Sequence, residues 1–414
     1  MGGPDIVTPL PVDDLRTLRR RSSAKWRSYD PDVLPLPVAE TDFALAPVVR
    51  TVLADAVERS DTGYAMTVPR LGEAVAGFAS RRWGWQVEPG DVSGLADVGV
   101  AAVEVLRALC EPGDAVVISP PVYPPFFHWV EEVRARLVQV PLRQQPVGGW
   151  RLDLDALESA FRERPRAYVL CSPHNPVGRV HDHGELTALA ALAAEHGVTV
   201  VADEIHAPVV LPGAAFTPFL TVPGGAEVGV SLVSASKAFN LAGLKCAAVV
   251  TGSDPMRAVT ARLPPDGRWR VGQFGLLATV AAMTDGDPWL DALLATLHLR
   301  RTQLADLLAQ RLPAVHWQPP EATFLAWLDC RAAGDGTAPR DLCLERGRVG
   351  LEPGPAFGAP GSGWVRLNFG TSAEILDQAV TRMVAALKWA GRDDEPCPSA
   401  GRRECSSLVS RATG

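Results

Sequence analysis

The sequence predicts an α/β fold, in which a large domain with a mostly parallel sheet flanked by helices is followed by a smaller α+β domain. Between residues 96 and 240, segments with apolar residues three and four apart alternate with short apolar runs. These runs are apolar on both faces, which is typical of buried parallel strands. Near residue 286 the alternation gives way to a long helical segment, two strand-like segments and a closing helix.

The order of these elements divides the 414-residue chain into four parts. Residues 1–45 are rich in proline and are expected to form an N-terminal arm that joins the smaller domain. The large domain is expected over 46–285 and the smaller one over 286–390, whose first helix should be N-capped by Asp287 because proline follows it. Residues 391–414 are polar and rich in glycine, serine, proline and arginine, which is typical of a disordered tail.

Each predicted element carries a local signal. The helical segments show the three-and-four spacing, and two of them close on glycine, at Gly113 and Gly197. The strands are short apolar runs bounded by residues that favour turns. Helices are expected over 46–60, 69–84, 99–114, 154–165, 184–197, 287–313 and 372–391. Strands are expected over 115–121, 134–142, 167–173, 198–204, 229–236 and 246–252, with strand-like segments in 314–330 and 363–372.

Composition limits the classes of partner. The formal net charge of −7 argues against a nucleic-acid-binding or anionic-membrane surface, so the basic segment 16–27 is interpreted as a solvated arm or a subunit contact. No apolar run reaches the roughly 18 residues that a membrane span needs, and the N-terminus lacks the apolar core of a signal peptide. The seven cysteines are scattered without CxxC spacing. We therefore expect no metal site, no disulfide framework and a reducing, cytoplasmic location.

Four predicted strands end in residues that could share one site. Tyr123, Asn175, Asp203 and Lys237 stand at these ends. Ligands of α/β sheets bind at the carboxyl ends of strands, so we expect the four side chains to converge. Taken singly, each has a plainer interpretation: a loop aromatic, a turn former, a helix cap and a solvated lysine. Their joint arrangement favours a shared site.

These residue types suit a carbonyl cofactor with a pyridine ring and a phosphate. A lysine beside small residues is desolvated, and its amine can then form a Schiff base. A buried aspartate can hold a proton on a pyridine nitrogen, which makes the ring an electron sink. An asparagine can donate to a phenolate oxygen, and a tyrosine can stack on the ring. The hydroxyls of Ser234 and Ser236, and the helix N-terminus in "DVGVAAVEVL", are candidate phosphate donors.

The motifs resemble a known family. "SPHNPVG", "ADEIH" and "SASKAFNLAGL" resemble pyridoxal-phosphate enzymes of the aspartate-aminotransferase fold, fold type I. "KWRSYDPDVLPLPVAETDF", "GYA", "PPVYPPFF", "EATFLAWLDCR" and "PGPAFGAPGSGWVRLNFGTS" are similar to the MalY/PatB-type cystathionine β-lyases, the C–S lyase branch of the class-I/II aminotransferases. The resemblance covers about residues 20–390.

The resemblance implies a role for each matched residue near the cofactor ring. Lys237 would form the Schiff base and act as the general base. Asp203 would pair with the pyridine nitrogen, Asn175 with the phenolate oxygen, and Tyr123 with the ring face. His206 occupies a position near that oxygen where aminotransferases often have tyrosine.

Further contacts are implied around the phosphate and the substrate. The phosphate contacts are implied for Ser234, Ser236, Lys245, and the backbone of Val100 and Ala101. Tyr64 would reach the phosphate from a neighbouring subunit, which implies a homodimer. Arg366 would bind the substrate α-carboxylate through a planar pair of donors, with Ala39 and Asn175 also at the substrate.

Three positions depart from the family pattern. Pro37 stands where family members usually have tryptophan, and Thr41 where they have methionine. Both positions lie at the substrate mouth in the family, so we expect substrate choice rather than chemistry to differ. Lys245 stands where many relatives have an arginine on the phosphate, and a lysine supplies a point charge there.

The resemblance implies a carbon–sulfur β-elimination. L-Cystathionine or another cysteine S-conjugate would yield a thiol, pyruvate and ammonia. An aminotransferase is the alternative, because the same residues serve both reactions until the Cα proton has left. A regulator without catalysis is disfavoured because Lys237, Asp203 and Arg366 are all present. The "KWRSYDPDVLPLPVAETDF" and "LAWLDCR" segments favour the lyase.

Overall fold

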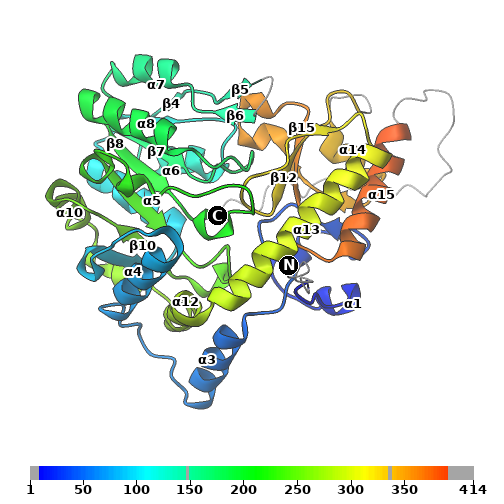
Figure 1. Ribbon diagram of the computed structural model, residues 1–414, viewed down its shortest axis with the longest axis horizontal. Coiled ribbons are helices and arrows are strands. Elements are labelled where there is room, and N and C mark those ends of the chain that lie inside the picture. Colours follow the sequence, from blue (N-terminus) through cyan, green and yellow to red (C-terminus); the bar gives the residue numbers. More distant parts are fainter. Residues whose placement is uncertain (1–8, 146–148, 334–337, 390–414) are drawn as a thin grey trace, which may run out of the picture.

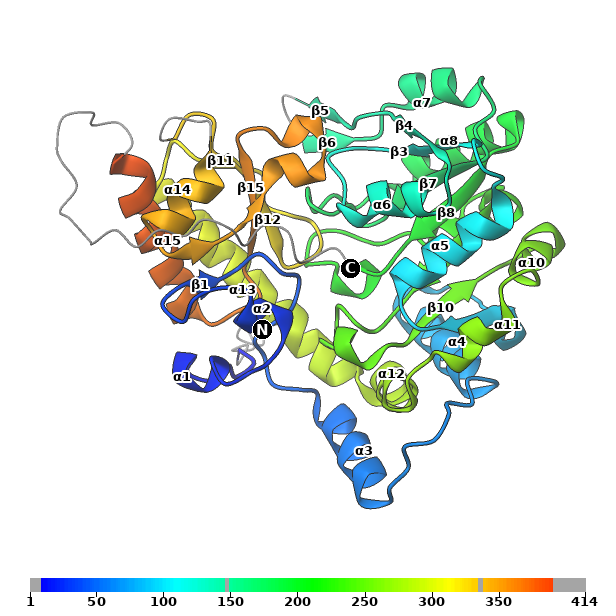
Figure 2. The same cartoon turned by 180° about the vertical axis from the view of Figure 1, so that it is seen from behind.

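The structure, a computed structural model, describes residues 9–145, 149–333 and 338–389. The tail predicted for 391–414 lies outside this part of the chain. Figures 1 and 2 show a larger group of elements, mostly cyan to green, beside a smaller group coloured yellow to red. The helix α13 (Asp287–Arg311) runs obliquely from the larger group across the smaller one.

A seven-stranded sheet forms the centre of the larger group. Its strands, in spatial order, are β2 (Val92–Leu95), β10 (Ala247–Val250), β9 (Gly229–Val233), β8 (Thr199–Asp203), β7 (Ala167–Cys171), β3 (Ala115–Ile118) and β4 (Arg136–Gln139). Neighbours from β9 to β4 are parallel, whereas β10 is antiparallel to both β9 and β2. The predicted α/β fold with a mostly parallel sheet is confirmed.

Helices cover both faces of this sheet, because successive residues of a strand point to opposite sides. In β3, Val116 and Ile118 face one core and Val117 faces the other, which explains why the run is apolar throughout. The first core is closed by α5 (Val98–Leu109), α6 (Pro125–Glu132) and α10 (Asp254–Thr260). The second is closed by α4 (Arg70–Trp83), α7 (Leu154–Phe161), α8 (His183–His196) and α12 (Gln273–Asp285).

The order of the parallel strands determines where the predicted site residues lie. Because β3, β7, β8 and β9 are neighbours, their carboxyl ends form one continuous edge. Asp203 is the last residue of β8, opposite Cys171 of β7. Tyr123, Asn175 and Lys237 stand in the loops that follow the other three strands. The sheet thus brings four residues that are far apart in sequence to one edge.

A four-stranded antiparallel sheet forms the centre of the smaller group. Its strands, in spatial order, are β11 (His316–Trp317), β12 (Leu325–Asp329), β15 (Trp364–Asn368) and β14 (Glu352–Pro353). The helices α14 (Pro339–Glu345) and α13 pack against α15 (Ala373–Trp389). In the N-terminal arm, β1 (Leu34–Pro35) pairs in parallel with β13 (Val349–Gly350). The domain limits at residues 45, 285 and 390 remain a prediction.

The expected N-cap of the long helix is wrong by one residue. Gly286 is the N-cap of α13, and Asp287 is its first residue. The Asp287 carboxylate accepts a hydrogen bond from Arg81 Nε at 2.8 Å rather than from the helix backbone. Gly286 has no side chain that could accept from the first-turn N–H groups, so this helix begins without a side-chain cap.

Other elements were not singled out by the sequence patterns. Among them are β2, α6 and α12. The others are α1 (Leu15–Leu18), α2 (Ala24–Arg27), α9 (Gly225–Val228), α11 (Pro265–Trp269), β5 (Arg143–Gln145) and β6 (Gly149–Arg151). By contrast, α3 (Pro47–Glu58) lies where a helix was expected over 46–60. Short 3₁₀ segments are η1 (Pro89–Asp91), η2 (Ala207–Val209), η3 (Phe219–Thr221), η4 (Ala242–Leu244), η5 (Gly354–Phe357) and η6 (Ala359–Gly361). Within the described ranges, no helix has the length and apolarity that crossing a membrane requires.

Candidate active site

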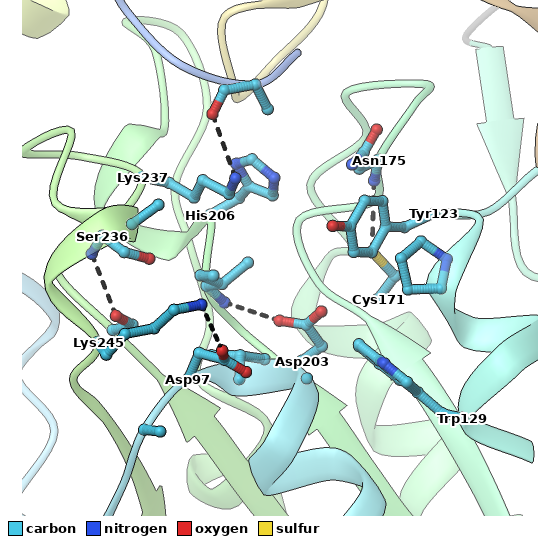
Figure 3. A pocket seen from close by; sticks show the side chains of 18 of the residues that line it. Asp97, Tyr123, Trp129, Cys171, Asn175, Asp203, His206, Ser236, Lys237 and Lys245 are labelled. Atoms are coloured by element: carbon cyan, nitrogen blue, oxygen red, sulfur yellow. Dashed lines mark hydrogen bonds and ion pairs between the residues drawn. The ribbon is translucent and has the colours of Figure 1, made fainter. Parts of the chain in front are cut away.

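A cavity of about 330 Å³ lies at the carboxyl edge of the large sheet. Its volume falls within the range of small-molecule sites. Tyr123, Asn175, Asp203 and Lys237 all line it, as Figure 3 shows. The structure therefore brings together the four strand-end residues that the sequence singled out.

Lys237 reaches the cavity from the loop that follows β9. Its Nζ donates a hydrogen bond to the carbonyl of Ala39 at 3.2 Å. Burial, followed by the positive charge of Arg366, lowers the pKa of Lys237 to about 8. Part of the amine population is therefore unprotonated near neutral pH, which a nucleophile or general base requires. The interpretation as a solvated surface lysine does not fit this environment.

Asp203 and His206 supply buried polar groups on the sheet side of the cavity. Asp203 Oδ1 accepts from the Ile205 N–H at 3.1 Å, and burial raises the pKa of Asp203 to about 7. Burial, and then the charge of Lys237, holds the pKa of His206 well below its usual value, so its ring is neutral. His206 Nδ1 has no hydrogen-bond partner among the described residues. This buried nitrogen retains bonding capacity that a ligand could use.

Arg366, in β15 of the smaller sheet, is not among the cavity-lining residues, but it contacts Asn175, which is. Its guanidinium donates to Asn175 Oδ1 at 3.0 Å and to the Pro37 carbonyl at 2.7 Å. It also lies over the Phe357 ring, 4.9 Å from the centroid. The side chain is buried, and Nε has no partner among the described residues. A fixed planar cation with unused donors is suited to a carboxylate.

Tyr123 is held among aromatic side chains of α6. Its ring makes edge contacts with Trp129 and Phe126, at centroid distances of 6.3 and 6.4 Å. Burial raises the pKa of Tyr123, so its hydroxyl stays protonated at neutral pH. Figure 3 shows the Tyr123 ring in the wall of the cavity above Trp129. This position suits a ring that packs against a planar ligand.

The start of α5 differs from the expected arrangement of phosphate donors. The Val100 N–H donates to Asp97 Oδ1 at 2.8 Å, and the Ala101 N–H donates to the Asp97 carbonyl at 2.9 Å. Neither Val100 nor Ala101 is among the cavity-lining residues, whereas Asp97, Val98 and Gly99 are. The N-terminus of α5 faces the cavity as predicted, but it does so through Asp97, Val98 and Gly99 and not through Val100 and Ala101.

The two serines of the "SASK" stretch differ in their hydrogen bonds: the Ser234 side chain is bonded within the protein, whereas Ser236 contributes its backbone N–H. Ser234 Oγ donates to the Cys246 carbonyl at 2.8 Å and accepts from the Ser236 N–H at 3.1 Å. Its hydroxyl proton is therefore engaged within the protein. Both serines line the cavity beside Lys245. Ser234 would have to rotate its hydroxyl to donate to a phosphate.

The segment 37–42 forms the wall of the site nearest the N-terminal arm. Each of its six carbonyls accepts a hydrogen bond from a side chain, and the donors are Arg366, Asn368, Lys237, Lys25, Asn240 and Arg21. No sequence pattern predicts this row of carbonyls, because backbone acceptors do not depend on residue type. Ala39 lines the cavity, but the side chains of Pro37 and Thr41 are buried and are not among its lining residues.

Tyr64 lies away from the cavity of its own chain. Its side chain is 82% exposed and makes an edge contact with Trp269, at a centroid distance of 5.8 Å. Met66, Val68 and Trp269 are also exposed. Large apolar side chains gathered in this way are typical of a surface that another protein covers.

The residues present fit pyridoxal phosphate. A buried amine and a buried carboxylate face one cavity, with an aromatic ring and an amide at its wall. The unpaired nitrogen of His206 leaves room for a further polar contact. In the part of the chain that the structure describes, no three His, Cys, Asp or Glu side chains are arranged to hold a metal ion.

Asp97 and Trp129 are among the lining residues that the sequence did not identify as site residues. Asp97 stands at the start of the predicted helix, and an aspartate three residues before a helical N–H is a recognisable N-cap signal. Trp129 had no signal, because an apolar residue at helical spacing is typical of a core. In the structure Trp129 stacks on Phe126 and lines the cavity.

The model of the family "Aminotransferase class I and II" matches residues 31–383. A Mycobacterium leprae protein, provisionally named a cystathionine beta-lyase, is 42% identical over 92% of this chain and 98% of its own length. The cystathionine beta-lyase PatB of Bacillus subtilis is 35% identical over 86% of this chain and 93% of its own. A Corynebacterium diphtheriae structure, described provisionally as a PLP-dependent beta-cystathionase, has a TM-score of 0.86 and 32% identity, covering 91% of this chain and 98% of that one.

Proposed function

The chain belongs to the aminotransferase class I and II family, and from this premise we propose that it is a pyridoxal-phosphate-dependent carbon–sulfur β-lyase. Its substrate would be L-cystathionine or a related cysteine S-conjugate, and its products a thiol, pyruvate and ammonia. The observation that carries the cofactor chemistry is the placement of Lys237 and Asp203 on one cavity. The names of relatives that span nearly the whole chain favour the lyase over the aminotransferase.

Pyridoxal phosphate supplies, when bound, an electron sink for the electrons of the broken Cα–H bond. Lys237 would link to it and, once displaced by the substrate amine, take the Cα proton at Nζ. The lowered pKa of Lys237, about 8, suits a base that must accept a proton near neutral pH. Asp203 would hold a proton on the ring nitrogen. The positive charge of that nitrogen would lower the raised pKa of Asp203 and so favour its ionised form.

Asn175, Tyr123 and Arg366 would orient the reacting groups. Asn175 would donate from its amide nitrogen, since its oxygen already accepts from Arg366. Arg366 would bind the α-carboxylate with donors beyond the two that hold it in place. These contacts fix the Cα–H bond relative to Lys237, which is the geometric requirement for elimination.

We further propose that the protein works as a cytoplasmic homodimer in which Tyr64 completes the partner's site. The exposed surface of Tyr64, Met66, Val68 and Trp269 supports this arrangement. On this proposal, Tyr64 would contact the phosphate bound in the neighbouring subunit, together with Ser234, Ser236 and Lys245 of that subunit.

A mixing experiment tests the shared site. Tyr64→Ala and Lys237→Ala should each be nearly inactive alone, whereas refolded or co-expressed mixtures should recover activity. The recovered fraction comes from hybrid dimers, in which one site combines an intact Lys237 with an intact Tyr64 from the other chain. Turnover of the mixture is measured against the two unmixed variants, and a mixture no more active than its components contradicts the shared site.

The reaction itself is tested without any keto acid. The purified protein, loaded with pyridoxal phosphate, is incubated with L-cystathionine, and pyruvate and free thiol are followed. Equal amounts of both are expected. Absence of pyruvate, together with amino-group exchange after a keto acid is added, would establish the aminotransferase instead.

A further inference from the structure

A carboxylate occupies the end of the cavity where the phosphate donors gather. Asp97 caps α5 by accepting from the Val100 N–H at 2.8 Å through Oδ1, and it accepts from Lys245 Nζ at 2.9 Å through Oδ2. Asp97 and Lys245 both line the cavity, and Figure 3 shows the two side chains meeting there. Burial raises the pKa of Asp97, but these two hydrogen bonds outweigh it and leave the pKa below 3.8. Asp97 is therefore ionised at neutral pH.

The two partners of Asp97 are themselves anion-binding groups. A first-turn N–H of a helix and a lysine ammonium both bind phosphate oxygens. Lys245 adopts a left-handed backbone conformation with φ of 64°, which is unfavourable for a residue other than glycine. Such strain is typically retained where a side chain serves a site. Here the charge of that side chain is already neutralised by Asp97.

We infer that Asp97 competes with the cofactor's phosphate for Lys245, and so determines how tightly the protein retains pyridoxal phosphate. This inference rests on the proposed function, since it requires pyridoxal phosphate in this cavity. A phosphate entering the site meets a pair with no net charge, and it gains a cation only by separating Lys245 from Asp97. Asp97 is thus a positioning residue that acts through Lys245.

This competition predicts that pyridoxal phosphate binds more tightly when the negative charge of Asp97 is removed and the shape of the side chain is kept. Asp97→Asn keeps an oxygen for the Val100 N–H and removes the negative charge. We expect the dissociation constants of pyridoxal phosphate and inorganic phosphate to fall about fivefold at low ionic strength. The gain should shrink as salt is added, because 54% of the Lys245 side chain is exposed and solvent screens it. Asp97→Ser, which also caps a helix without a charge, should show the same gain.

A matched series separates competition from a structural cap. Lys245→Gln should weaken phosphate binding, and Asp97→Asn should bring a smaller gain in the Lys245→Gln background than in the wild-type one. Binding is measured by calorimetry on the cofactor-free full chain, with inorganic phosphate and with pyridoxal phosphate, alongside melting temperatures. If Asp97 only caps the helix or holds Lys245 in place, both charge-free variants will bind phosphate equally or more weakly, and the inference is overturned.

The outcomes also distinguish this inference from the proposed function. A wild-type protein that binds pyridoxal phosphate, while neither Asp97 variant binds it more tightly, overturns the role of Asp97 alone. A wild-type protein that binds no pyridoxal phosphate overturns the proposed function and this inference together.

Discussion

Replacing Lys237 with alanine is expected to lower pyruvate release from L-cystathionine by about a thousandfold or more, because one amine serves as both nucleophile and general base. The substitution should also abolish the covalent link to pyridoxal phosphate. The visible absorbance band of the linked cofactor is then lost, while the cofactor still binds reversibly through its other contacts. Turnover and the absorbance spectrum are measured on the same preparations.

Lys237→Arg is the informative companion to this variant. It keeps a cation within reach of the Ala39 carbonyl, which now accepts from Lys237 at 3.2 Å, but it provides no neutral amine. We expect it to be as inactive as Lys237→Ala. An arginine variant with a tenth or more of wild-type turnover would show that charge, rather than an unprotonated amine, is what this position supplies.

The strand-end residues were predictable because two local patterns coincide. Each short apolar run stands before a polar or aromatic residue, and helical segments between the runs require the strands to be parallel. Parallel strands place their carboxyl ends at one edge, so Asn175, Asp203 and Lys237 had to lie near one another if their strands were neighbours. The observed order β9–β8–β7–β3 supplies that condition.

The donors at the start of α5 show where sequence reasoning stops. A helix N-terminus leaves several N–H groups free only if no side chain caps it. Asp97 does cap α5, and it removes the Val100 N–H from the set available to a ligand. Whether a particular aspartate caps its helix depends on its rotamer and on competing partners such as Lys245, neither of which the local pattern specifies.

The wall at 37–42 was unpredictable for a different reason. Its carbonyls are held by side chains up to about 330 residues away in the sequence, such as Arg366 and Asn368. Such contacts depend on how the arm packs against both sheets. The family resemblance pointed to Pro37 and Thr41 as substrate-facing, yet their side chains are buried here. Their effect on substrate choice would therefore act through the placement of Ala39 and of Arg366, to which the Pro37 carbonyl is bonded.

Asp203→Asn is expected to lower turnover by about a hundredfold or more, because the amide cannot carry the charge that keeps a proton on the ring nitrogen. The two side chains have nearly the same shape, so the cavity should remain. Glu204→Gln is the matched control. Glu204 is also a buried carboxylate with its pKa raised to about 7, but it accepts from the Phe219 N–H and Ser231 hydroxyl and does not line the cavity. Its variant should retain turnover within a few-fold of the wild type.

The same substitution should stabilise the cofactor-free protein at alkaline pH. Burial raises the pKa of Asp203 from 3.8 to about 7. Between these two values the folded protein binds a proton that the unfolded chain has released, so the free energy of unfolding falls as pH rises through this window. Asp203→Asn removes this fall. Its melting temperature should therefore exceed that of the wild type above about pH 8, and the difference should shrink toward pH 4.

Saturating pyridoxal phosphate should reverse this order. In the loaded protein the ionised Asp203 gains a paired positive charge, and binding stabilises the folded wild type more than the variant. Thermal unfolding with and without cofactor measures both effects on the same protein. If the cofactor-free variant melts below the wild type at alkaline pH, the Asp203 carboxylate must already have a stabilising partner within the protein. The site would then be organised by that partner, and Asp203 would not be held in an unfavourable state that the cofactor relieves.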